Sequence, residues 1–448
     1  MTKFLPGLVV LLFPSIIATA QQDVLIQCRN NDMDLLRPLH QDDPVKLIQM
    51  ANAEAELEAF TQIFTGTVSD RDDADYIIPV VFHVIHNNGL ENITNAQIED
   101  AMRVLNLDFR RLNTDWENVN PAFLDLVADA RVEFRLAKRD PDGNCTTGIT
   151  RTESTLTNSG EQDMKDLIQW PRDHYLNVWV SAYAGGAAGY TYRPGSVDQF
   201  PSGDGIVLLH TYTGSIGTSS PSRSRTLTHE VGHWINLAHT WGNTNDPGEP
   251  ENCDEDDNVQ DTPNTIGWTS CNINGSSCNS PLDNVENYME YSYCGKMFTM
   301  GQATRMTAAL NSGTADRNEL WEGSNLVQTG VLEEGALCAA QFTGNGGVVC
   351  AGESITFHDQ SFHNVVSRSW SFPGGDPSTS TDPDPVVIYA EPGVHPVILT
   401  VSDGSSTLTT TSEEFVKVLS VPGAIVPFFE GFEEISELNG TDWSVSEE

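Results

Sequence analysis

The sequence predicts an α/β (α+β) domain with a twisted mixed sheet, followed by a small all-β sandwich. A β-branched and aromatic run at 76–85 indicates a buried strand. A capping-box pattern from Thr94 to Gln97 precedes apolar residues at helical spacing, which indicates an amphipathic helix after that strand. After Cys338, short alternating apolar runs separated by Pro, Gly, Asp and Ser indicate antiparallel strands. The 448 residues also exceed one ordinary core, so we expect several domains.

The first twenty residues have the order of a secretory signal peptide. Lys3 precedes an apolar run at 4–18, and the small residues Ala-Thr-Ala at 18–20 form a cleavage site. No other segment is apolar over the length that a membrane span requires. We therefore expect a secreted, extracellular protein without a membrane span, in which cysteines form disulfides.

Changes in composition divide the rest of the chain. Residues 21–72 are polar, with helical periodicity around Leu47, Met50, Leu57 and Phe60, and we interpret them as a pro-segment. The main domain is predicted at 73–325 and the sandwich at 336–421. Residues 422–448 resemble the start of a further β module or a linker, which suggests that the chain is a fragment.

Within the main domain, further strands are predicted at 132–136, 176–180 and 205–209.

The balance of charged residues excludes one class of partner. Lys and Arg total 23 against 63 Asp and Glu, for a net charge of −40, which excludes binding to a nucleic-acid backbone. Clustered carboxylates instead favour calcium.

The segment 229–239 carries the chemistry, because it has the pattern HExxHxxxxxH. On a helix, His229 and His233 lie one turn apart and can bind one ion, with Glu230 beside it. His239 can join them only if the chain turns sharply near Asn236. Asn adopts the left-handed conformation that such a turn needs more readily than most residues.

Three neutral imidazoles match the ligand set of a catalytic zinc ion with an open fourth position for water. A neighbouring carboxylate can accept a proton from that water, so Glu230 is the predicted general base.

With the turn at 287–291 (NYMEY), the extended motif resembles the metzincin metallopeptidases and, among them, the secreted bacterial pappalysins. The resemblance runs from about residue 78 to 306 and includes DPDG at 140–143, GITR at 148–151, DTP at 261–263 and FTMGQ at 298–302. It implies a metzincin catalytic domain with an active-site helix. It further implies His229, His233 and His239 as zinc ligands, Glu230 as base, Met289 as the Met-turn residue and Tyr291 as the group that reaches the oxyanion.

The same resemblance implies two disulfides and a structural calcium ion. Cys253 would pair with Cys278 and Cys271 with Cys294, although four cysteines allow three connectivities. The loop at 251–262 is rich in carboxylates, and its Asp257 and Thr262 match calcium positions of the family.

Cys28 has two interpretations. Family zymogens suggest a cysteine switch, in which the Cys28 thiolate fills the fourth zinc position. Alternatively, Cys28 pairs with the remaining Cys145. Asp32 or Asp34 could cap the metal if the thiol does not.

The region after Cys338 resembles a PKD-type domain, an immunoglobulin-like sandwich, through WSFPGG at 370–375, Tyr389 and Gly393. A disulfide between Cys338 and Cys350 would join its first strands. We expect a spacer or a module for attachment to a surface or matrix.

Together these features predict a secreted zinc endopeptidase, made as a zymogen, that acts on protein or peptide substrates. Basic-specific relatives have an Asp shortly after the tyrosine of the Met-turn, and here Tyr291 is followed by SYCGK. Strict preference for basic side chains is therefore not expected. The alternative is a catalytically silent adhesion or binding protein that retains the metzincin fold.

Overall fold

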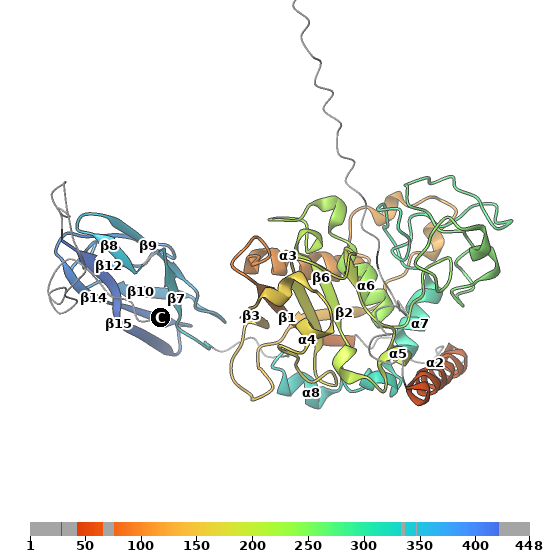
Figure 1. Cartoon of the computed structure of the whole chain (residues 1–448), viewed down its shortest axis with the longest axis horizontal. Helices are drawn as coiled ribbons and strands as arrows, with labels where there is room; N and C mark the ends of the chain where they lie inside the picture. Colours follow the sequence, from red (N-terminus) through yellow and green to blue (C-terminus); the bar gives the residue numbers. More distant parts are fainter. Residues whose placement is uncertain (1–27, 29–42, 66–75, 333–336, 346, 421–448) are drawn as a thin grey trace, which may run out of the picture.

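The computed structural model describes residues 28, 43–65, 76–332, 337–345 and 347–420. The expected signal peptide, Asp32, Asp34 and the segment 422–448 lie outside the described residues. Figure 1 shows an α/β region around β1 and an all-β region formed by β7 to β15. The predicted fold class is confirmed.

The α/β region contains a six-stranded mixed sheet with the order β2-β1-β4-β6-β5, and β3 also pairs with β1. The central β1 pairs in parallel with β2, β3 and β4, whereas β5 is antiparallel to β6 at the edge. The sequence predicted four of these strands. It missed β3, which is polar, and β5, which has two residues. The bounds are Tyr76–His86 for β1, Val132–Leu136 for β2, Ile149–Glu153 for β3, Leu176–Ser181 for β4, Gly189–Tyr190 for β5 and Ile206–Leu209 for β6.

The helices lie around this sheet (Figure 1). The predicted capping box before α3 forms only in part. The Thr94 hydroxyl accepts a hydrogen bond from the Gln97 backbone amide at 3.2 Å. The Gln97 side chain donates to the carbonyls of His210 and Thr213, and does not bond to the backbone of Thr94 as a complete capping box requires. The bounds are Pro44–Thr65 for α2, Asn95–Phe109 for α3, Gln162–Lys165 for α4, Pro194–Val197 for α5, Thr226–Trp234 for α6, Met300–Leu310 for α7 and Gly323–Gln328 for α8.

A buried ion pair fixes the end of α6 to the sheet. The fully buried Arg317 donates to both carboxylate oxygens of Asp204, at 2.7 and 2.8 Å. The Trp234 indole donates to the same carboxylate at 2.9 Å, and its ring lies under the Arg317 guanidinium. Because both charges are paired and hydrogen-bonded, their burial is tolerated, and α6 acquires a defined position.

The C-terminal region is a sandwich of two sheets, with the orders β12-β10-β14-β15-β8 and β11-β13-β9-β7. Trp370, Phe357 and Tyr389 are fully buried between them. The bounds are Phe342–Gly344 for β7, Val348–Cys350 for β8, Ser354–Asp359 for β9, Ser367–Ser371 for β10, Gly375–Asp376 for β11, Thr379–Ser380 for β12, Val386–Tyr389 for β13, Gly393–Ser402 for β14 and Thr407–Leu419 for β15.

Two cysteine predictions were wrong. The structure joins Cys145 to Cys338, so neither the pair Cys338–Cys350 nor the alternative pair Cys28–Cys145 forms. Cys338 precedes β7 and lies against the loop after β2, whereas Cys350 ends β8 in the other sheet. Beside the disulfide, His363 contacts the Thr146 carbonyl at 2.7 Å, so the sandwich is tied to the α/β region at this point.

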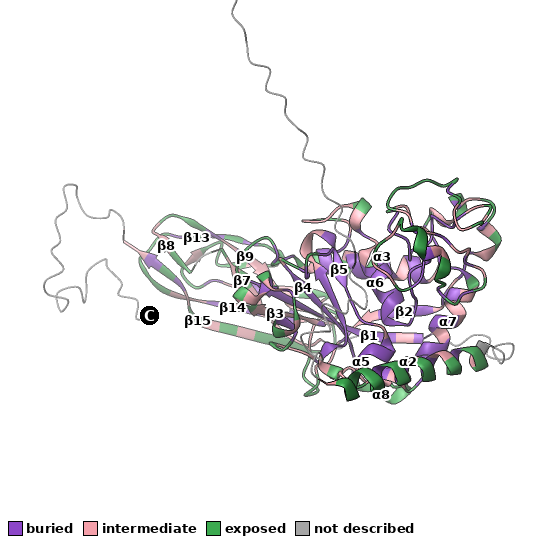
Figure 2. Cartoon of the chain, turned by 45° about the vertical axis from the view of Figure 1, so that its right-hand side comes forward, coloured by how far each residue is buried: buried purple, intermediate pink, exposed green. Residues whose placement is uncertain are grey.

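Figure 2 shows α2 at the surface with its outward face exposed, and the central sheet strands buried. Among the described helices, none combines the length and apolar character that crossing a bilayer requires.

The buried His83 on β1 makes the stability of the α/β region depend on pH. Its Nε2 contacts Asn177 Oδ1 at 2.9 Å and its Nδ1 contacts Thr150 Oγ1 at 2.7 Å, which suits the neutral ring. Burial lowers the pKa of His83 to about 4, against 6.5 ordinarily. The unfolded chain therefore binds the proton first, and acidification from pH 6.5 to about 4 should reduce the unfolding free energy by about 3 kcal/mol.

Denaturant unfolding, followed by fluorescence of the neighbouring Trp170 and Trp179, measures this loss. We expect His83→Gln to make the pH dependence shallower in that window by about 3 kcal/mol, while His229, His233 and His239, whose pKa values burial also lowers, keep the remainder. The control His358→Gln, at a side chain 45% exposed, should keep it. A wild-type chain of constant stability between pH 6.5 and 4 would contradict the assignment.

Candidate functional site

Helix α6 ends early and the chain then reverses, as the motif requires. The helix stops at Trp234, and Asn236 has a φ of 78°, in the left-handed region. The Leu237 amide donates to the Gly232 carbonyl at 2.9 Å, which closes the helix end. The turn predicted at Asn236 is confirmed, and it brings His239 back beside His233.

The three imidazoles are oriented by backbone carbonyls. Their Nδ1 atoms lie 2.7 Å from the Tyr288 carbonyl, 2.8 Å from the Leu237 carbonyl and 2.9 Å from the Thr244 carbonyl, for His229, His233 and His239 respectively. Carbonyl oxygens only accept, so each Nδ1 carries the proton and each Nε2 carries a lone pair.

These lone pairs converge on one point. The Nε2 of His233 lies 3.0 Å from that of His229 and 3.1 Å from that of His239. Neither Nε2 of such a pair has a proton to donate, so these contacts are repulsive without a cation between them. Burial lowers the pKa of His229 to about 4 and those of His233 and His239 well below their ordinary value, which keeps all three rings neutral. The donor set fits a divalent metal ion such as zinc.

Glu230 lies beside this point on the same helix. Its side chain is fully buried, and neither carboxylate oxygen has a hydrogen bond of good geometry among the described residues. Burial raises the pKa of Glu230 to about 8, and the nearby Cys28 thiol opposes the rise. Edge strand β5 approaches it closely, since a Cβ atom on Gly189 would lie 3.1 Å from the Glu230 Cγ. Glu230 thus lies next to the edge of the sheet and lines the same pocket as His229.

Met289 lies against α6 at Gly232, which is next to His233 in the motif. A Cβ atom on Gly232 would lie 2.5 Å from the Met289 sulfur, so a larger residue there would displace the Met289 side chain. The turn that carries Met289 is held by Asn287, which accepts from the Met289 amide at 2.9 Å. Asn287 in turn exchanges two hydrogen bonds with Gln302 of α7, at 2.9 and 3.1 Å.

Tyr291 packs against the rings of His229 and His239. Its hydroxyl donates to the backbone carbonyl of Cys28 at 2.7 Å, and burial raises its pKa well above 10. Tyr291 therefore retains its proton and is hydrogen-bonded to the Cys28 carbonyl.

Cys28 lies at the histidine cluster itself. It is 6% exposed, and its sulfur and one ligand nitrogen from each of His229, His233 and His239 all lie within 4.8 Å of one another. The structure thus brings together Cys28 and the three predicted ligands.

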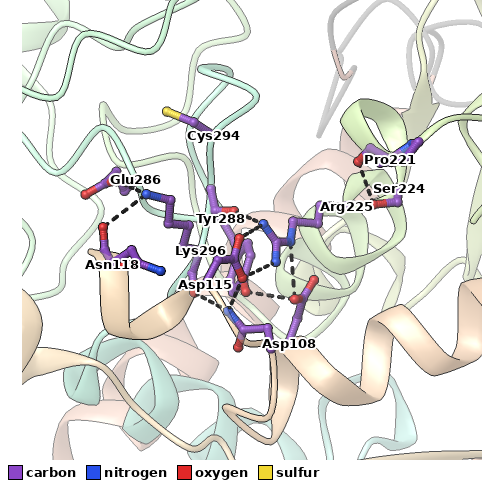
Figure 3. A network of polar contacts seen from close by, with 12 residues as sticks. Asp108, Asp115, Asn118, Pro221, Ser224, Arg225, Glu286, Tyr288, Cys294 and Lys296 are labelled. Carbon is purple, nitrogen blue, oxygen red and sulfur yellow. Dashed lines mark hydrogen bonds and ion pairs between the residues drawn. The ribbon is translucent and has the colours of Figure 1, made fainter. Parts of the chain in front are cut away.

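A polar network supports the start of α6 (Figure 3). Arg225 donates to both carboxylate oxygens of Asp115 at 2.7 Å, and to the Gly295 carbonyl at 2.7 Å. The buried Asp108 of α3 accepts from Thr228 and from the Tyr288 hydroxyl, both at 2.8 Å. The backbone of Tyr288 also holds His229, so the network reaches the histidine cluster.

Sequence reasoning assigned no supporting role to Asp108, Asp115, Arg225, Asn287 or Gln302, although Asn287 and Gln302 lie in motifs that the resemblance includes. Gln302 was detectable, because Thr299 and Gln302 have capping-box spacing and form a complete box at the start of α7. Asp108 and Asp115 gave no local signal, since their partners lie more than 100 residues away.

A pocket opens from the histidine cluster. Its lining includes Glu230 and Tyr291 at the cluster and, farther along, Arg223, Arg225 and Tyr293. The segment after Tyr291 contributes no carboxylate to it. Glu290, which precedes Tyr291, also lines the pocket, and its buried carboxylate accepts hydrogen bonds from the Thr240 hydroxyl at 2.6 Å and the Trp268 backbone amide at 2.8 Å.

The segment between α6 and α7 is crosslinked by two disulfides, Cys253–Cys278 and Cys271–Cys294, and these are the two pairs that the resemblance implied. In its acidic loop, the buried Asp257 accepts from the Thr262 hydroxyl at 2.8 Å on each carboxylate oxygen. The two predicted calcium residues are therefore in contact.

Comparisons with known proteins agree with this geometry. Residues 158–311 match the Peptidase M43 family, described as Pregnancy-associated plasma protein-A, and residues 339–414 match the PKD domain. An extracellular metalloprotease of Pyricularia oryzae is 31% identical over 273 residues, which cover 58% of this chain and 81% of that protein. One of Sordaria macrospora is 29% identical over 281 residues, with 60% and 86% covered.

Solved structures are similar as well. Mature mirolysin of Tannerella forsythia in complex with a cleaved peptide has 36% identity and a TM-score of 0.52, over 57% of this chain and 99% of that one. A mutant of promirolysin from the same organism has 32% identity and a TM-score of 0.56, over 66% and 98%.

The left-handed turn at Asn236 gives a testable prediction. Glycine adopts this conformation freely. A residue with a Cβ atom, other than Asn, makes the left-handed turn less stable by about 1–2 kcal/mol. The Asn236 side-chain nitrogen makes no hydrogen bond among the described residues, so its loss costs little. We expect Asn236→Gly to keep zinc affinity, and Asn236→Ala to weaken it about tenfold, in competition with a chelating dye. Equal affinities of the two variants would contradict this role.

Proposed function

This chain belongs to the Peptidase M43 (pappalysin) family and is a metalloendopeptidase, and from that premise we propose a secreted zinc enzyme made as a zymogen. The observation that carries the proposal is the convergence of three neutral imidazoles, each fixed by a carbonyl, with the Glu230 carboxylate beside them. His229, His233 and His239 would hold the zinc ion. When bound, zinc would supply Lewis-acid activation of water and of the scissile carbonyl.

The chain's own groups would handle the proton. Glu230 would accept a proton from the attacking water and return it to the leaving amine nitrogen, which breaks the peptide bond. Its burial supports this role, because a carboxylate that is poorly solvated holds a proton more readily. Tyr291 would donate a hydrogen bond to the oxyanion once its hydroxyl leaves the Cys28 carbonyl. Met289 would support the ligands through its contact at Gly232.

We further propose that Cys28 maintains latency. Its sulfur lies among the three ligand nitrogens, and its carbonyl occupies the Tyr291 hydroxyl. One residue would thus block the metal position and the oxyanion donor together. Activation would require removal of the segment that carries Cys28, within the proposed pro-segment 21–72.

Secretion, the domain boundaries and the calcium site are further parts of the proposal. Secretion rests on the signal-peptide pattern at 1–20 and on extracellular relatives. The proposed boundaries remain 73–325 for the peptidase and 336–421 for the sandwich, which could attach the enzyme to a surface or matrix. Calcium at Asp257 and Thr262 is supported by their contact in a carboxylate-rich loop.

The central test of catalysis is the variant Glu230→Ala. We expect cleavage of a peptide library by the matured protein to fall at least about a hundredfold, because the proton acceptor is lost. Exhaustive chelation should abolish cleavage and added zinc should restore it. The control Glu249→Ala, at an exposed carboxylate, should cleave normally. Undiminished cleavage by Glu230→Ala would refute the proposed base.

Latency is tested with two cysteine variants of the full chain. Cys28 and Cys350 are the two described cysteines outside the disulfides. We expect Cys28→Ser to cleave a fluorogenic peptide without prior processing, because a hydroxyl is a weaker zinc ligand than a thiolate. Cys350→Ser should stay as latent as the wild type. If both variants stay latent, Cys28 is not the switch.

A further inference from the structure

Helix α2 docks at a surface separate from the histidine cluster. It packs against α5 and α7. Its buried face consists of Met50, Ala53, Leu57 and Thr61, which lie on one side at helical spacing. The proposed pro-segment therefore has two described parts: Cys28, whose sulfur lies at the histidines, and α2, which Figure 1 shows beside α5 and α7.

The fit of α2 to α5 is close. A Cβ atom on Gly195 would lie 2.8 Å from both the nitrogen and the Cα of Glu54, so the absence of a side chain lets the two backbones approach. Such an approach requires complementary shapes, and loose packing on a surface does not produce it.

Two arginines complete the contact. The Glu58 carboxylate accepts a hydrogen bond from Arg305 at 2.6 Å. The Glu54 carboxylate accepts a hydrogen bond from the Ser196 hydroxyl at 3.0 Å and forms an ion pair with Arg193 at 3.6 Å. The Arg305 and Arg193 side chains are only 5% and 13% exposed. In a chain of net charge −40, this pair forms a local basic site, matched by two carboxylates one helical turn apart.

Arg305 also touches the metal-binding loop. Its Nε donates to the Asn236 carbonyl at 2.8 Å, while its Nη2 donates to Glu58. One guanidinium thus connects α2 with the left-handed turn between His233 and His239. Arg305 is in this sense a positioning residue, because it supports the turn and touches no reacting atom.

We propose that the surface formed by Arg193, Gly195, Ser196 and Arg305, the α2 contact surface, is a binding site for a helix that presents a stripe of small and apolar side chains together with two carboxylates. Its occupant is residues 44–65 of this chain, held even after the chain is cut between α2 and β1. The inference rests on the proposed function in one respect, that residues 21–72 are a removable pro-segment. After the cut, the helix acts as a dissociable regulator. It stabilises the turn at Asn236 for as long as it stays bound.

The test starts from the full chain carrying Cys28→Ala, with recognition sequences of a site-specific protease in place of 36–42 and 66–72. After cutting, the helix is removed by gel filtration in salt with mild urea, which weakens both the ion pairs and the apolar contacts. The urea is then dialysed away, and a fluorescent synthetic peptide of residues 43–65 is added back. We expect saturable binding by fluorescence anisotropy, weakened by salt. Binding should also slow amide hydrogen exchange at Leu237, next to the turn.

Peptide variants test the chemistry without altering the enzyme. Glu58→Gln should weaken binding about tenfold, because a charge-assisted hydrogen bond to Arg305 is lost. Glu56→Gln, at an exposed position of the same helix, should bind like the wild type. Absence of binding, equal binding of the two variants, or unchanged exchange at Leu237 would overturn the proposal. Neither readout requires metal or activity, so failure here is distinct from failure of the proposed catalysis.

Discussion

Three imidazole rings, held so that their Nε2 lone pairs face one another, are the constraint on which the rest of this structure depends. Each ring is fixed by a carbonyl from a different place: the Met-turn at Tyr288, the residue after the Asn236 turn, and the loop at Thr244. The three lone pairs repel one another without a cation. The positions of these three segments are therefore coupled to the binding of a metal ion.

Buried polar groups hold those segments in place. Asp108, Asp115 and Arg225 secure the start of α6, while Asp204 and Arg317 secure its end. Each charge has a partner of opposite sign, which makes its burial tolerable and its geometry specific. The proposed pro-segment uses the same framework from outside, with Cys28 at the ligands and α2 joined through Arg305 to the turn. In the proposed zymogen, latency and support of the metal-binding loop would thus be exerted at two different surfaces.

The sequence predicted what local patterns determine. The helical spacing of His229 and His233, the turn at Asn236 and the strand at 76–85 follow from periodicity and backbone preference, and the structure has all three. Partners distant in the chain left no such pattern. The disulfide Cys145–Cys338 joins residues 193 apart, and the contact of Glu58 with Arg305 spans 247 positions. Such pairs are selected by the packing of domains, which spacing along the chain does not reveal.

The most direct test of the account is optical spectroscopy of the full chain with cobalt(II) in place of zinc. Three imidazoles and the Cys28 thiolate around one ion predict four-coordinate visible bands and a sulfur-to-cobalt charge-transfer band. The charge-transfer band should vanish in Cys28→Ser while the visible bands persist. A cobalt-loaded wild-type chain without that band would contradict a metal centre shared by the three histidines and Cys28.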